Sequence, residues 1–341
     1  MRRSFSLLAA FLCLLVAGCD VDPVSVVVTD SFPIETAPVD VLWVIDNTNS
    51  MGDIQTAVGA AFPSFLAPLT SSAVEWRVGI TTTDVVDATW RGRLADLGGG
   101  AVFADPTTGN PSGVFASAAQ VGLEGSNLER GLQAAWWAVT PPLTTHENLG
   151  FLRDDARLAV VVVSDEDDCS DEGALTDEQP GSCAAQPNAL VPTTEYLARL
   201  RSLKDDPLDV SVFALVETGV TGEFEGCGGS TPGSRYIDLA RRTGGEVWPL
   251  CGDFDATLGE LGEGVAGLRR AFPLGRTPDP ATLEVSRIDL LGGLPVAVVE
   301  DPTRTDGWTW DSASNSIRLW GLSEPLLGET VTVRYEVGNG I

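Results

Sequence analysis

Two nearly continuous apolar runs stand out along this chain of 341 residues. Val39–Ile45 and the run at 158–163 contain almost no polar side chain, as expected of strands that are covered on both faces. Further apolar stretches at 75–82, 208–216 and 246–250 have the length of strands. The pattern predicts a mostly parallel sheet between layers of helices, because helices on both faces are what bury such strands.

Segments with apolar residues at three- and four-residue intervals separate these strands. In the segment 127–139, Leu128, Leu132 and Val139 share one face of a predicted helix. Further helices are predicted over 53–69, 194–203, 235–243 and 254–272. Since strands alternate with helices, residues 39–272 are predicted to form a doubly wound, Rossmann-like α/β domain.

The pattern changes near Pro273. Residues 277–280 are predicted to form a linker. The apolar stretches beyond this linker are short and separated by turn residues. They lie at 283–290, 296–299, 308–311, 316–320 and 330–337. The sequence therefore predicts a small β-sandwich-like, all-β module over 278–341.

The first 38 residues differ from both regions. Arg2 and Arg3 precede an apolar run that is too short to span a bilayer, and the run ends in LVAGC at Cys19. This ending resembles the bacterial lipobox, in which the peptide is cut before a cysteine that is then acylated. We expect residues 1–19 to be a lipoprotein signal peptide, with an ordinary signal peptide as the alternative, and residues 20–38 to be an extended tether. The expected location is extracytoplasmic, at the periplasmic or outer face of a bacterial membrane.

Charge and cysteine content add two constraints. The chain has 21 Lys and Arg against 48 Asp and Glu, a formal net charge of −27, which argues against nucleic-acid binding because phosphate neutralisation needs a basic surface. Four cysteines follow Cys19, and outside the cytoplasm they indicate disulfides. Three pairings are open, and short spacing favours Cys169–Cys183 and Cys227–Cys251. A zinc site is disfavoured, because no CxxC spacing occurs and the chain has one histidine.

Polar side chains follow the two most apolar strands. Asp46, Thr48 and Ser50 alternate after the first strand, and Asp165 follows the second. Ligands bind at the carboxyl edge of such sheets, so we expect these residues to converge there. Ser126, at the start of the intervening helix, is expected to complete the site. These hard oxygen donors suit Mg²⁺, Mn²⁺ or Ca²⁺.

The set Asp46-x-Thr48-x-Ser50, Ser126 and Asp165 resembles the metal-ion-dependent adhesion site of von Willebrand factor type A (vWA) domains. That family's pattern is Asp-x-Ser-x-Ser, a Thr from a middle loop and a later Asp, and the resemblance covers about 39–272. It implies that Thr48 and Ser50 touch the metal, while Asp46 and Asp165 act partly through water. This chain departs from the pattern twice, with Thr48 for Ser and Ser126 for Thr. The whole chain, with VSDEDDCS at 163–170, also looks like lipoprotein families of predatory and social proteobacteria.

The resemblance implies a protein that binds a protein or peptide partner at the cell envelope through one divalent cation. Mg²⁺ is the expected cation, and an acidic side chain of the partner is expected to bind at its open coordination position. Catalysis is not expected, because His146 is the only histidine and Walker A, GxSxG and HExxH motifs are absent from the sequence. The alternatives are an envelope scaffold with a vestigial metal site and, less favoured, a secreted hydrolase.

Three further features have two interpretations each. The acidic stretch 166–172 is either a solvated loop, which is favoured, or a second calcium site. The threonines at 81–83 are a less favoured alternative to Ser126 as the residue that completes the cation site. Trp308, Trp310 and Trp320 either pack in the β module, as favoured, or form a platform for carbohydrate.

Overall fold

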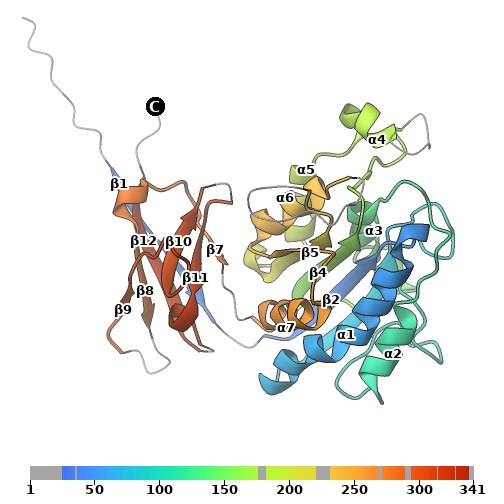
Figure 1. Ribbon diagram of the computed structural model, residues 1–341, viewed down its shortest axis with the longest axis horizontal. Coiled ribbons are helices and arrows are strands. Elements are labelled where there is room, and N and C mark those ends of the chain that lie inside the picture. Colours follow the sequence, from blue (N-terminus) through green and yellow to red (C-terminus); the bar gives the residue numbers. More distant parts are fainter. Residues whose placement is uncertain are drawn as a thin grey trace, which may run out of the picture.

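The computed structural model describes residues 25–34, 37–175, 182–219, 231–267, 271–288, 293–312, 314–326 and 328–337. Within these ranges the chain forms an α/β domain and a β-sandwich that lie beside each other (Figure 1). The predicted fold class is confirmed, since a parallel sheet flanked by helices is accompanied by a small all-β module.

Five parallel strands form the centre of the α/β domain. In spatial order they are β3 (Trp76–Thr82), β2 (Val39–Ile45), β4 (Arg157–Ser164), β5 (Val210–Val216) and β6 (Val247–Pro249). Successive side chains of β2 enter different cores: Val41 and Trp43 pack on one side of the sheet, and Leu42 and Val44 on the other. Both faces are therefore buried, which explains why β2 and β4 lack a polar alternation.

Helices cover both faces of this sheet (Figure 1). One layer contains α1 (Gly52–Ser71), α2 (Pro111–Ala118) and α7 (Phe254–Val265), and the other contains α3 (Gly131–Ala138), α5 (Thr193–Arg201) and α6 (Ser234–Thr243). The short α4 (Ser182–Ala185) precedes α5. Trp43 contacts Phe65 of α1 and Phe115 of α2 edge-on, with ring centroids 5.3 and 5.1 Å apart. These aromatic contacts anchor α1 and α2 on β2 and so position the loop that follows β2.

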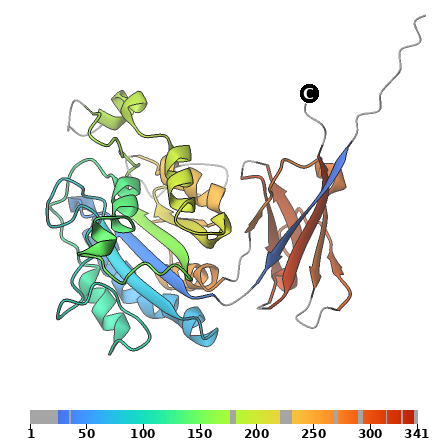
Figure 2. The same cartoon turned by 180° about the vertical axis from the view of Figure 1, so that it is seen from behind.

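Two antiparallel sheets form the β-sandwich. The first contains, in order, β1 (Val26–Pro33), β12 (Thr330–Val337), β8 (Glu284–Ile288) and β9 (Val296–Val298), and the second contains β10 (Gly307–Asp311), β11 (Ser316–Trp320) and β7 (Ala271–Pro273). Figure 2 shows β1, in blue, alongside the red strand β12. Phe32, Phe272, Ile317 and Val331 are buried between the two sheets.

The structure corrects two boundaries. The segment 20–38, predicted as a tether, contains β1, which pairs with β12 from Val26 opposite Val337 to Pro33 opposite Thr330. The helix predicted over 254–272 ends at Val265, and β7 follows it, so the sandwich begins before 278. A tether and an edge strand are both extended, and the pairing partner of β1 lies at the other end of the chain. Sequence periodicity alone therefore did not distinguish them.

Within the described ranges, no helix is both long enough and apolar enough to cross a membrane. The predicted signal peptide, the lipidation site Cys19 and Cys227 all lie outside those ranges.

Candidate functional site

The loops after β2 and β4 meet at the carboxyl edge of the sheet. Asp46 is fully buried, and its Oδ1 accepts hydrogen bonds from the backbone N and the Oγ1 of Thr48 at 2.8 and 2.7 Å. Its Oδ2 accepts one from Ser164 Oγ at 2.7 Å. Thr48 Oγ1 lies 3.3 Å from Ser50 Oγ. Asp46, Thr48, Ser50 and Ser164 thus form one hydrogen-bonded set, called the Asp46 group below.

Asp165 lies beside the Asp46 group. Burial raises the pKa of Asp46 from its usual 3.8 to about 6, and the negative charge of Asp165 adds to this rise. Oδ1 of Asp165 is buried and has no hydrogen-bond partner. A buried carboxylate oxygen of this kind costs free energy unless a donor or a cation satisfies it.

Polar contacts tie the loop after β2 to the loop before α3. The side-chain amide of Gln55 donates to Asp46 O and Gly122 O at 3.0 and 2.9 Å. Gly125 N donates to Asn47 O at 2.8 Å. A Cβ at Gly125 would lie 2.3 Å from Asn47 Oδ1, so a larger residue here would require the Asn47 side chain to move.

The structure does not bring Ser126 into the Asp46 group. Ser126 N donates to Asp84 Oδ2 at 3.1 Å, and Ser126 Oγ accepts from Leu128 N at 3.2 Å. Within the described ranges, no hydrogen bond joins Ser126 to the Asp46 group or to Asp165. Its hydroxyl instead closes a local turn, a common use of serine ahead of a helix.

Glu129 is the residue of this region that sequence reasoning missed. Its side chain is 1% exposed, and neither carboxylate oxygen has a hydrogen-bond partner. Burial raises the pKa of Glu129 well above its usual value, and the nearby carboxylates of Asp46 and Glu166 raise it further. The available signal was the spacing Ser126-x-x-Glu129, but that spacing equally suits a helix capping box.

This oxygen-rich edge fits a hard divalent cation. Buried side-chain oxygens without a hydrogen-bond partner belong to Asn47, Thr81, Glu129 and Asp165. In the part of the chain that the structure describes, no three His, Cys, Asp or Glu side chains form a ready metal-holding group. A cation would therefore need hydroxyl ligands in addition to carboxylates. Oxygens of both kinds are ligands of Mg²⁺ and Ca²⁺.

The acidic stretch after Asp165 is mainly structural rather than solvated. The carboxylate of Asp168 is buried and accepts from Leu132 N and from Arg235 Nε, both at 3.0 Å. Asp171 forms a buried ion pair with Arg130 at 2.7 Å. Because these donors already satisfy Asp168 and Asp171, neither aspartate is available as a ligand of a second calcium site.

The predicted disulfide Cys169–Cys183 is present, with Cα atoms 5.5 Å apart. It lies beside buried Leu128 and Leu175 and so closes the acidic stretch over a small apolar cluster. Cys251 is also disulfide-bonded. Its predicted partner Cys227 lies outside the described residues, so the second pairing stays a prediction.

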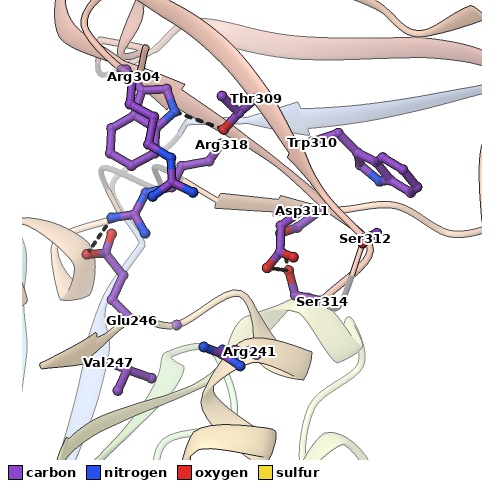
Figure 3. A pocket seen from close by; sticks show the side chains of 13 residues that line it. Arg241, Glu246, Val247, Arg304, Thr309, Trp310, Asp311, Ser312, Ser314 and Arg318 are labelled. Atoms are coloured by element: carbon purple, nitrogen blue, oxygen red, sulfur yellow. Dashed lines mark hydrogen bonds and ion pairs between the residues drawn. The ribbon is translucent and has the colours of Figure 1, made fainter. Parts of the chain in front are cut away.

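A cavity of about 290 Å³ lies between the two domains (Figure 3). Arg318 of β11 reaches across it to Glu246, with 3.1 Å between Nη2 and Oε2. The guanidinium carbons of Arg318 and Arg304 lie 4.6 and 5.6 Å from the centre of the Trp320 ring. Trp308 is buried in the sandwich and donates to Val298 O. These contacts favour packing over a carbohydrate platform for both tryptophans.

No protein-family model matches the chain, and no curated protein matches its sequence. Among solved structures, a von Willebrand factor type A protein from Catenulispora acidiphila is 11% identical, with a TM-score of 0.41 over 94% of this chain and 67% of that one. The pilus adhesin SpaC from Lactobacillus rhamnosus GG is 11% identical, with a TM-score of 0.37 over 92% of this chain and 40% of that one. The pilus adhesin RrgA from Streptococcus pneumoniae is 11% identical, with a TM-score of 0.31 over 92% and 58%. The chain thus spans 40% and 58% of the two adhesins, and likenesses this distant assign neither a function nor a site.

Proposed function

We propose that this chain is a vWA-type binding protein that holds one divalent cation at Asp46, Thr48, Ser50 and Asp165. The observation that carries the proposal is the Asp46 group, in which carboxylate and hydroxyl oxygens of Asp46, Thr48 and Ser50 meet near the charge of Asp165. Buried polar atoms are normally satisfied, and a cation here would satisfy the buried Oδ1 of Asp165, which has no hydrogen-bond partner.

Each residue has a separate part in this proposal. The hydroxyls of Thr48 and Ser50 touch the cation, while Asp46 and Asp165 hold it partly through water. Ser164 and Gln55 orient Asp46 by the hydrogen bonds described above. When bound, the cation offers an electrophilic position that a carboxylate of a protein or peptide partner can occupy. The sequence favours Mg²⁺, with Mn²⁺ and Ca²⁺ as alternatives.

We further propose that the protein acts outside the cytoplasm, tethered to a bacterial membrane by acylated Cys19. The disulfide in the α/β domain supports an oxidising compartment. The formal net charge of −27 supports a partner other than nucleic acid. The role is one of binding and needs no catalytic residues.

Calorimetric titration of Mg²⁺, Mn²⁺ and Ca²⁺ into the chain from residue 20 onward tests the cation site. We expect saturable binding that weakens at least about tenfold in Asp46→Ala and in Asp165→Ala, because each removes a group that holds the ion. Asp53→Ala is the matched control, since Asp53 is an exposed carboxylate in the first turn of α1. Equal binding by the parent and both site variants would refute the assignment.

Capture of envelope proteins by the immobilised chain tests the second half of the proposal. We expect a partner that is retained with the cation, released by EDTA and absent when Asp46→Ala replaces the parent. A partner retained equally in EDTA and by Asp46→Ala would instead indicate a scaffold that does not use the cation site.

A further inference from the structure

Glu129 differs from the buried carboxylates of the α/β domain that form ion pairs. Asp40, Asp168 and Asp171 each accept hydrogen bonds from an arginine. Glu129 is as deeply buried as these three, yet neither of its oxygens has a hydrogen-bond partner. Keeping an unpaired carboxylate in the interior is costly, so this side chain is not explained by packing or by an ion pair.

The backbone of Glu129 is fixed at the carboxyl edge of the sheet. Its carbonyl accepts a hydrogen bond from Cys169 N at 2.6 Å, in the segment after β4. The next residue, Arg130, donates its backbone N to Thr83 O at 3.0 Å, just after β3. Glu129 is therefore held between the ends of two strands that flank β2, which is the strand that leads into Asp46.

The side chain of Glu129 lies close enough to the candidate cation site for the charge of Asp46 to act on it. The charges that act on it most strongly are those of Asp46 and Glu166, on the loops after β2 and β4. Neither neighbour carries a positive charge that could pair with Glu129. A divalent cation would supply that charge, and carboxylate oxygens are ligands of such cations.

We propose that Glu129, and not Ser126, supplies the ligand from the loop before α3, and that its carboxylate makes Ca²⁺ the preferred cation. The inference rests on the proposed cation site and deepens it. Replacing a neutral hydroxyl with a carboxylate raises the negative charge around the ion. Mg²⁺ is usually held by one or two carboxylates and several waters, whereas Ca²⁺ accepts six to eight oxygens in flexible geometry. That higher coordination number leaves room for a partner's carboxylate beside Glu129.

Titration of Ca²⁺ and of Mg²⁺ alone into the chain from residue 20 onward tests this proposal, with four proteins compared. They are the parent, Glu129→Gln, Glu129→Asp and Ser126→Ala. We expect the parent to bind Ca²⁺ more tightly than Mg²⁺. Glu129→Gln, which keeps the shape and removes the charge, should weaken Ca²⁺ binding at least about tenfold and Mg²⁺ binding less.

Two controls keep the test independent of folding. Ser126→Ala should bind Ca²⁺ within about threefold of the parent, since its hydroxyl serves a local turn. Glu129→Asp keeps a carboxylate and should retain more Ca²⁺ affinity than Glu129→Gln. Melting in EDTA verifies that each variant is folded before the titration.

The outcomes separate this inference from the proposed function. If the parent binds a cation and Asp46→Ala does not, while Glu129→Gln binds like the parent and Ser126→Ala is weakened, the inference is wrong and the proposed function stands. If the parent binds none of the cations, both are wrong. Loss of Ca²⁺ affinity in Glu129→Gln with retention in Ser126→Ala supports the inference.

Discussion

At the residue scale, two groups of buried carboxylates in the α/β domain differ in their partners. Asp40 and Asp168 form ion pairs with Arg153 and Arg235, which lie 113 and 67 positions away along the chain. Asp46 and Glu129 have no arginine partner of this kind among the described residues, and the charge of Asp46 raises the pKa of Glu129. The first kind stabilises the fold, whereas the second stores an electrostatic cost that a bound cation would remove.

This difference predicts how stability depends on pH. The pKa of Asp46 is raised from 3.8 to about 6 in the folded chain, mainly by burial and further by Asp165. A carboxyl with a raised folded pKa contributes stability that is fully present below its unfolded pKa and is lost as pH rises through the folded value. In EDTA we therefore expect the melting temperature to fall between about pH 4 and pH 7. The accompanying loss in the free energy of unfolding is on the order of a few kcal/mol.

Thermal melting across this pH range, in EDTA and in saturating Ca²⁺, provides the measurement. The cation should remove the fall, because it stabilises the charged carboxylates. Asp46→Asn has no proton to lose and should show a smaller fall in EDTA than the parent. A melting temperature in EDTA that rises steadily over this range would contradict the prediction.

At the scale of elements, the candidate site depends on loops that other elements hold in place. Gln55 of α1 ties the loop after β2 to Gly122. The backbone of Cys169, after β4, holds Glu129. The disulfide Cys169–Cys183 pins this same segment over Leu128, one residue from Glu129. Local order at the site therefore relies on contacts between segments that are well separated in sequence.

Removal of this disulfide should weaken the domain measurably. Its cysteines are 14 positions apart, and closing a loop of this length stabilises a protein by about 3 kcal/mol in the chain-entropy model. We expect the Cys169→Ala, Cys183→Ala double variant to lose about that much free energy of unfolding in denaturant titrations. With reductant present, parent and variant should unfold together. A variant as stable as the oxidised parent would show that the bridge contributes nothing.

At the scale of the whole molecule, the α/β domain is inserted into the β-sandwich. β1 precedes the α/β domain and β7 follows it, yet both belong to the sandwich. The pair Arg318–Glu246 adds a direct contact between the two domains (Figure 3). The chain thus leaves and re-enters the sandwich, and two connections join the domains.

A shortened chain tests this arrangement. A chain that begins at residue 37 lacks β1 and the buried side chains of Phe32 and Ile34. Loss of a large buried apolar side chain typically costs about 2–5 kcal/mol, so we expect the sandwich to become sensitive to protease while the α/β domain stays resistant. Limited proteolysis with mass spectrometry locates the cuts, and a chain that begins at residue 25 is the control. A sandwich that resists protease equally in both chains would contradict the role of β1.

The sequence by itself determined the α/β fold and the sheet's buried strands, and it favoured the pairing of Cys169 with Cys183, because periodicity and short spacing are local properties. It also located Asp46, Thr48 and Ser50, which follow one strand directly. Tertiary structure alone decided that β1 pairs with β12, a contact between opposite ends of the chain. It likewise decided that the backbone N of Ser126 donates to Asp84, while Glu129 is buried where the charge of Asp46 acts on it. The two residues are three positions apart on one loop, and their different surroundings depend on how that loop packs against the ends of β3 and β4.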